Sequence, residues 1–92
     1  MILNFICADT GALFNGRRVV RFVNIQSVAL RKLAVLNRAV RVEELRVPPG
    51  NHLEALNGNR AGQHSIRIND QWRVCFVFEN GNALNVEIVD YH

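Results

Sequence analysis

Three side chains that can take part in proton transfer follow one another at the end of the sequence, at Asp90, Tyr91 and His92. A carboxylate, a phenol and an imidazole can each give or take a proton during a reaction. Arg73 adds a permanent cation, and strand alternation places it on the face opposite its apolar neighbours. These four residues are the first candidates for chemistry. In the alternative interpretation, Tyr91 packs on a sheet while Asp90 and His92 are solvated.

Short strands joined by turns are predicted for the second half of the chain. Apolar and polar residues alternate there with period two, which is typical of strands with one buried face. Asn69-Asp70 and Asn80-Gly81 are the predicted hairpin turns, and Asn-Gly is typical of a type I′ turn, in which both residues have positive φ. The alternating segments are 65–69, 72–78 and 84–92, the last with Leu84, Val86 and Ile88 on its core face.

Two helices are predicted ahead of these strands. Asp9 and Thr10 are cap-type residues before a short apolar segment, and Asn15-Gly16 is a typical C-terminal stop. Asn24 is the predicted cap of a longer helix, and Pro48-Pro49-Gly50 ends the helical region. Apolar positions spaced three and four apart form the stripe of this helix: Ile25, Val28, Ala29, Leu33, Leu36 and Val40.

The segment from Ile2 to Cys7 is apolar and too short for a helix, so we expect a strand there. The order of elements predicts an α+β fold. In it, an N-terminal strand and two or three helices pack on one face of a mostly antiparallel four- to five-stranded sheet. With 92 residues, of which 49% are hydrophobic, the chain is expected to form a single domain over residues 1–92.

Several classes of protein are not expected from the composition. No apolar run approaches the roughly 18 residues of a membrane span, and a signal peptide is not expected, so we predict a cytoplasmic protein with no membrane contact. Cys7 and Cys75 lie in apolar segments without metal-ligand spacing. We therefore expect two free thiols, no metal and no cofactor.

The charge is unevenly divided between the two halves of the chain. The first 46 residues carry eight Arg and Lys against three Asp and Glu, a net charge of +5, whereas the last 46 carry three against five, a net charge of −2. This division suits a protein that docks on a large polyanion with one part and acts on it with another. A solvated basic helix face is the alternative.

The second half of the chain resembles the HigB toxins of the RelE/ParE superfamily. The resemblance implies a RelE-like fold and a toxin that cuts messenger RNA in the A site of the 70S ribosome, held inactive by a HigA-like helix-turn-helix antitoxin. The residues that carry it are Leu53, Leu56, Gly58, Arg60, Gly62, Ser65, Ile66, Ile68, Asn69, Trp72, Arg73, Val74, Phe76, Gly81, Ala83 and the closing Asp90-Tyr91-His92.

Under this resemblance the candidate residues acquire roles in metal-free RNA cleavage. Arg73 would stabilise charge on the phosphate, because its forked donors match phosphate oxygens. His92 would be the general acid, since an unperturbed imidazole titrates at about 6.5, and the chain's terminal carboxylate would favour its charged form. Tyr91 would stack on a base or donate to phosphate, Asp90 would orient His92 or accept a proton, and Glu54 would serve as base.

Arg60, Arg67, Asn57 and Gln71 are the predicted RNA-binding residues. Some relatives have a histidine at the position of Glu54 and a lysine at the position of Asn57. This chain therefore has one cation fewer for binding phosphate. His52 would lie on the same strand face as Glu54 by period-two alternation and is a candidate substitute or a solvated residue. Two rival functions stay open: a ParE-like toxin that poisons DNA gyrase without nuclease activity, and a weakened toxin that acts mainly as an antitoxin partner.

Overall fold

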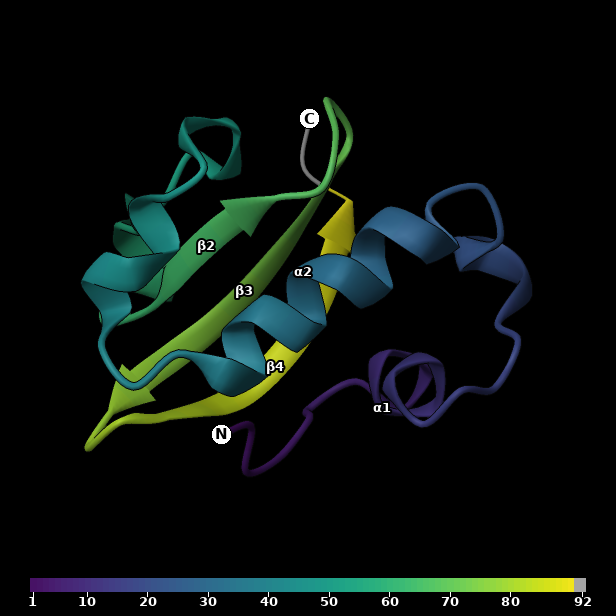
Figure 1. Cartoon of the computed structure of the whole chain (residues 1–92), viewed down its shortest axis with the longest axis horizontal. Helices are drawn as coiled ribbons and strands as arrows, with labels where there is room; N and C mark the ends of the chain where they lie inside the picture. Colours follow the sequence, from purple (N-terminus) through teal and green to yellow (C-terminus); the bar gives the residue numbers. More distant parts are fainter. Residues whose placement is uncertain (91–92) are drawn as a thin grey trace.

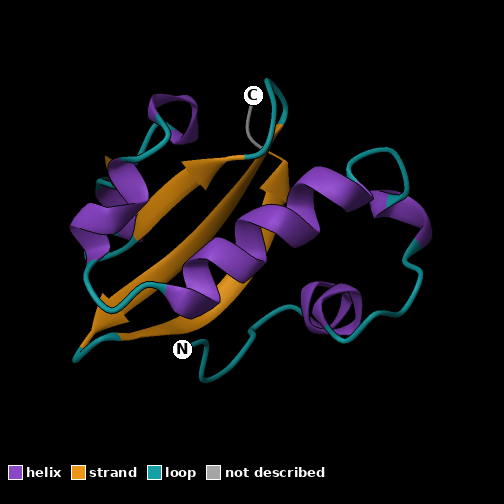
Figure 2. Ribbon diagram, viewed as in Figure 1, coloured by secondary structure: helices purple, strands orange, loops and turns teal. Residues whose placement is uncertain are grey.

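The computed structural model describes residues 1–90, in which two helices pack against a four-stranded antiparallel sheet (Figure 1). The strands lie in the order β1-β2-β3-β4. Figure 2 shows α2 crossing one face of the sheet. The predicted α+β class is confirmed. The elements are α1 (Ala8–Phe14), η1 (Val20–Phe22), α2 (Gln26–Arg38), η2 (Val42–Arg46), η3 (Pro49–Asn51), β1 (Glu54–Ala55), η4 (Gly58–Arg60), β2 (His64–Arg67), β3 (Trp72–Glu79) and β4 (Asn82–Asp90), where η denotes a 3₁₀ turn.

The predicted N-terminal strand is two separate bridges to β4. Ile2 pairs with Ala83 and Phe5 with Val86, both in parallel orientation. Between the bridges, the ladder is replaced by side-chain bonds: the backbone N–H of Asn85 donates to Asn4 Oδ1 at 3.0 Å, and Asn4 Nδ2 donates to Asn85 Oδ1 at 2.9 Å. The segment therefore follows the outer edge of β4 without forming a continuous strand.

A β-bulge in β4 changes which side chains reach the core. Cys75 pairs with Glu87 but Val77 pairs with Leu84, so β4 has one extra residue in this interval. The extra residue is accommodated at Asn85, whose backbone is left-handed with a φ of 53°. Ala83 is consequently fully buried, while Leu84 is only partly so. The prediction that Leu84 shares the core face with Val86 and Ile88 was wrong, because strict alternation ignores a bulge.

Both helices begin at positions other than the predicted caps. Cys7 precedes α1, and Thr10 is buried, with its hydroxyl accepting the backbone N–H of Ile88 at 3.0 Å. Ile25 is the residue before α2, because residues 20–25 form successive turns that delay the helix by one position. The predicted stop is confirmed, since Asn15 is the C-cap of α1.

A continuous core lies between α2 and the sheet. Ala29, Leu33 and Leu36 of α2 are fully buried, whereas Val40 lies beyond the helix end and is exposed. Trp72 packs edge-on against Phe22 with ring centroids 5.5 Å apart, as expected for a core tryptophan. The other fully or nearly buried apolar members of this core include Leu13, Leu45, Ile66, Val74, Phe76, Val86 and Ile88.

The turns at the ends of β3 position that strand. Asn80 and Gly81 have φ of 53° and 78°, which confirms the predicted type I′ hairpin. At the other end, the Asn69 carboxamide oxygen accepts the backbone N–H groups of Gln71 and Trp72, each at 2.8 Å. Within residues 1–90, none of the helices has the length and apolar character needed to cross a membrane.

Candidate active site

Arg73 lies on the face of β3 opposite Val74 and Phe76. It contacts Ser65, His52 and Glu54, and we call these three residues the cradle of Arg73. Only 8% of the residue is exposed. Its Nε donates to the hydroxyl of Ser65 at 2.8 Å, and its Nη2 donates to the carbonyl of His52 at 2.6 Å. A carboxylate oxygen of Glu54 lies 3.9 Å from Nη2. Among residues 1–90, the guanidinium therefore donates to two neutral acceptors and lies near the Glu54 carboxylate.

Strand register accounts for two members of this cradle. Ser65 pairs with Cys75 of β3 and with Glu54 of β1, so all three side chains share the face that carries Arg73. Glu54 lies on the two-residue strand β1, and 54% of its side chain is exposed. The predicted pair of Arg73 and Glu54 is therefore brought together by the sheet.

His52 supplies its backbone rather than its imidazole. It follows the turn η3 with a left-handed φ of 45°, which directs its carbonyl to Arg73. The alternation that we used to place its side chain beside Glu54 does not apply, because His52 lies before β1 in a non-extended conformation. Its side chain takes no part in the hydrogen bonds that fix Arg73.

Asn51, which is fully buried, anchors the turn that carries His52. Its Nδ2 donates to the carbonyl of Leu45 at 3.1 Å and to that of Val47 at 3.3 Å. Its Oδ1 accepts a hydrogen bond from Lys32 Nζ of α2. Helix α2 is thereby linked through one side chain to the loop that positions Arg73.

Asp90 and Gln71 meet where β3 and β4 end. Gln71 Nε2 donates to Asp90 Oδ2 at 3.0 Å. Asp90 pairs in register with Trp72, one position from the pair of Arg73 and Val89. Since neighbouring residues of a strand point to opposite faces, Asp90 and Arg73 do not share a face. The candidates Tyr91 and His92 lie outside the described residues.

The predicted RNA-binding arginines both contact carboxylates. Arg60 Nη1 lies 2.9 Å from Glu87, whose side chain is 20% exposed. Arg67 forms an ion pair with Asp70, which is almost fully exposed. Asn57 is exposed and precedes η4 as its N-cap residue. Arg67, the last residue of β2, pairs in register with Arg73 of β3.

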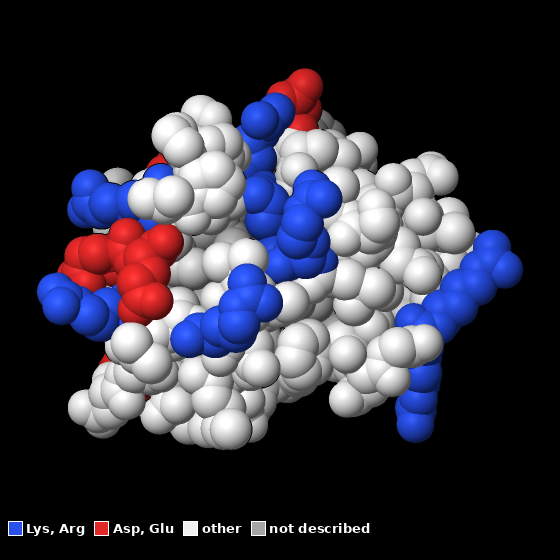
Figure 3. Space-filling view, viewed as in Figure 1, with Lys and Arg blue, Asp and Glu red and all other residues white. Residues whose placement is uncertain are grey.

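Basic side chains gather over the face that α2 covers. Figure 3 shows Lys and Arg across the middle of this face, with acidic residues toward its edges. The pKa of Lys32 is lowered by partial burial and by the nearby charges of Arg31 and Arg67. Three of the eight basic residues of the first half of the chain, Arg31, Lys32 and Arg38, lie on α2. In the described part of the chain, no group of three or more His, Cys, Asp and Glu could hold a metal ion.

Two contributors to the site were missed by sequence reasoning. Ser65 was assigned no role in the site, although its position on the polar face of β2 could have predicted a contact with Arg73. The His52 carbonyl had no signal, because a backbone acceptor is invisible to residue type and its direction depends on a left-handed conformation.

The fold and the cradle define a small α+β domain of the RelE type, with an arginine fixed on the central part of an antiparallel sheet. Residues 16–92 match the model of the HigB-like toxin family, described as the RelE-like toxin of the type II toxin-antitoxin system HigB. The chain belongs to this family.

Three curated proteins illustrate the similarity. The chain is 45% identical over 62 residues to Toxin HigB-1 of Vibrio cholerae, covering 67% of this chain and 65% of that protein. It is 38% identical over 69 residues to an uncharacterized protein of Haemophilus influenzae, covering 75% and 67%. It is 42% identical over 40 residues to Endoribonuclease HigB of Proteus vulgaris, covering 44% of each. The chain thus spans about two thirds or less of the length of these relatives.

Proposed function

We propose that this chain is an endoribonuclease toxin that inhibits translation by cutting messenger RNA in the ribosomal A site. Membership of the HigB-like toxin family and the similarity to a relative named as an endoribonuclease support the proposal. The observation that carries it is the cradle of Arg73, in which a nearly buried guanidinium lies 3.9 Å from the Glu54 carboxylate. A fixed cation beside a half-exposed base suits the charge and proton movements of phosphodiester cleavage.

In the proposed reaction the substrate's own 2′-hydroxyl is the nucleophile. Glu54 removes its proton while the oxygen attacks the adjacent phosphorus, and Arg73 stabilises the additional negative charge on the phosphoryl oxygens. His92 gives a proton to the departing 5′-oxygen as the P–O bond breaks, which leaves a cyclic phosphate and a free 5′-hydroxyl. Asp90 orients His92, and Tyr91 stacks on a base or donates to phosphate. No step requires a metal ion.

The two candidate RNA-binding arginines differ in how readily they exchange their carboxylate partners for phosphate. The partner of Arg67 is Asp70, whose side chain is 97% exposed, so water can solvate it when a phosphate displaces it. The partner of Arg60 is Glu87, at 20% exposure, and its release leaves a carboxylate partly buried. We therefore assign the larger phosphate contribution to Arg67, with Gln71 contacting RNA near it and Asn57 contacting RNA near the opposite end of β2.

Mapping the ends of a translated messenger tests this function directly. Wild-type protein is expected to cut the transcript on translating ribosomes, and Arg73→Ala and His92→Ala should each reduce the rate by at least about a hundredfold. Arg46→Ala is the matched control, because Arg46 is exposed on η2 and outside the cradle. Intact messenger with the wild type, or equal cutting by the wild type and His92→Ala, contradicts the proposal. DNA damage without messenger cleavage would identify a gyrase poison instead.

A further inference from the structure

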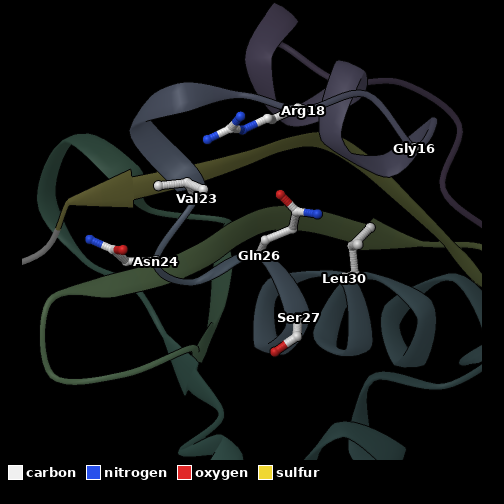
Figure 4. A pocket seen from close by; sticks show the side chains of 7 residues that line it. All are labelled: Gly16, Arg18, Val23, Asn24, Gln26, Ser27 and Leu30. Carbon is white, nitrogen blue, oxygen red and sulfur yellow. The ribbon is translucent and has the colours of Figure 1, made fainter.

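An open hollow of about 560 Å³ lies between the loop after α1, the turn η1 and the start of α2. Figure 4 shows Arg18 reaching across it from the loop, with Gln26 and Leu30 projecting toward it from α2. None of the described candidates for catalysis or RNA binding, all within residues 54–90, is among its lining residues. The lining residues are Gly16, Arg18, Val23, Asn24, Gln26, Ser27 and Leu30.

The border of the hollow is basic and partly apolar. Arg17 and Arg18 are exposed, and neither has a carboxylate within ion-pair distance among the described residues. Val20 on η1 is 78% exposed and Val23 is 41% exposed. The nearby ion pair of Arg21 with Asp9, at 3.0 Å, leaves the positive charge of Arg17 and Arg18 uncompensated. None of the described lining residues is acidic.

These features favour an acidic protein segment over RNA as the occupant. Single-stranded RNA is recognised largely by stacking on aromatic rings, and none of the lining residues within 1–90 is aromatic. Val23 and Leu30 offer an apolar floor, which apolar side chains of a peptide can cover. Arg17 and Arg18 then provide the complementary charge for its carboxylates.

We propose that this hollow is a docking site for an acidic segment of the cognate antitoxin, with apolar side chains seated on Val23 and Leu30. The inference rests on the proposed function as a toxin and on the type II toxin-antitoxin system named for the family that the chain matches. Docking here and the chemistry at Arg73 are separable, because Trp72 packs against Phe22 on one side of β3 and Arg73 lies on the other.

Charge reversal at Arg18 tests the site in the full-length toxin. The dissociation constant for the antitoxin encoded beside this chain is measured for Arg18→Glu and for the control Arg46→Glu. Arg46 is also an exposed cation and lies on η2, which follows the C-terminal end of α2, whereas the hollow adjoins the N-terminal end. A 13-residue helix is about 20 Å long, so the control is remote.

Arg18→Glu is expected to weaken antitoxin binding by at least about tenfold, with the loss reduced at high salt, and Arg46→Glu by less than about twofold. Messenger cleavage by Arg18→Glu should equal that of the wild type. Val23→Asp, at an exposed position, should weaken binding similarly without loss of folding.

Equal binding of the antitoxin by Arg18→Glu and the wild type overturns the docking site. Loss of ribosome or RNA binding by Arg18→Glu with unchanged antitoxin affinity overturns it in favour of an RNA contact. Failure of the nuclease proposal has a different signature: the wild type leaves messenger intact although Arg18→Glu still loses the antitoxin.

Discussion

The Nε of Arg73 donates a hydrogen bond to the hydroxyl of Ser65, 2.8 Å away on the neighbouring strand. Ser65 is fully buried, so water cannot replace this acceptor if it is removed. The bond, together with that from Nη2 to the His52 carbonyl, sets the plane of the guanidinium. A cation whose orientation is fixed before substrate arrives needs little rearrangement during a reaction.

Replacing Ser65 with alanine is expected to misplace Arg73. A buried charged donor without its acceptor costs about 1 to 3 kcal/mol, and we expect messenger cleavage to fall by at least about tenfold. Ser65→Thr keeps the hydroxyl and should restore much of the rate. Cleavage is measured on translating ribosomes, and urea unfolding of each variant reports stability. If threonine and alanine are equally impaired in cleavage at matched stability, the hydroxyl does not position Arg73.

Glu54→Gln separates proton transfer from ion pairing. The ion pair with Arg73 spans 3.9 Å at a half-exposed side chain, so its loss should change stability by less than about 1 kcal/mol. Loss of a general base typically lowers a rate by about 10² to 10⁴. Single-turnover cleavage measures the rate, with Glu79→Gln, an exposed residue at the end of β3, as control. If Glu54→Gln cleaves messenger RNA at the wild-type rate, the general base is another group.

Asn51→Ala should destabilise the protein through the turn before β1. The substitution removes donors to the Leu45 and Val47 carbonyls and the acceptor of Lys32. Leaving such buried groups unpaired is expected to cost roughly 2 to 4 kcal/mol in the free energy of unfolding. Asn59→Ala, at an exposed position of η4, is the control and should change stability little. Equal unfolding midpoints in urea would show that Asn51 is not an anchor.

The two thiols should differ in reactivity. Burial alone would raise the pKa of Cys7, but hydrogen bonds with Thr10 and Asp9 and the charge of Arg21 outweigh it and lower the pKa below 9.0. Burial is the main cause that raises the pKa of Cys75. Alkylation by iodoacetamide should therefore modify Cys7 first, with a rate that rises with pH and reaches half of its maximum below pH 9.0, because the thiolate is the nucleophile.

Mass spectrometry of the alkylated protein locates the modification. Cys75 is fully buried and should react only after unfolding in urea. Cys7→Ser should abolish rapid labelling, whereas Cys75→Ser should leave it unchanged. Faster labelling of Cys75 in the folded protein would contradict the assignment.

Sequence reasoning predicted the elements whose signals are local. The Asn80-Gly81 turn, the alternation of β3 and the stripe of α2 depend on residue type and spacing, and the structure contains all three. The order β1-β2-β3-β4 in the sheet is consistent with the short connections between successive strands.

What could not be predicted depends on contacts between distant residues. The bulge at Asn85 is stabilised by Asn4, 81 positions away, and it decides whether Ala83 or Leu84 is buried. The cradle of Arg73 likewise depends on the His52 carbonyl, which only the turn after Asn51 directs. Strand alternation placed Arg73 on the correct face but did not indicate that it would be almost fully covered.

The segment of residues 1–6 along β4 has a consequence for self-association. Unpaired backbone groups on the last strand of a sheet are a template on which a second copy can add a strand. Here Leu3 and Ile6 donate to the carbonyls of Ala83 and Val86. The opposite border of the sheet is the two-residue β1. Deleting residues 1–6 should uncover a long strand border and favour aggregation before any loss of the cradle.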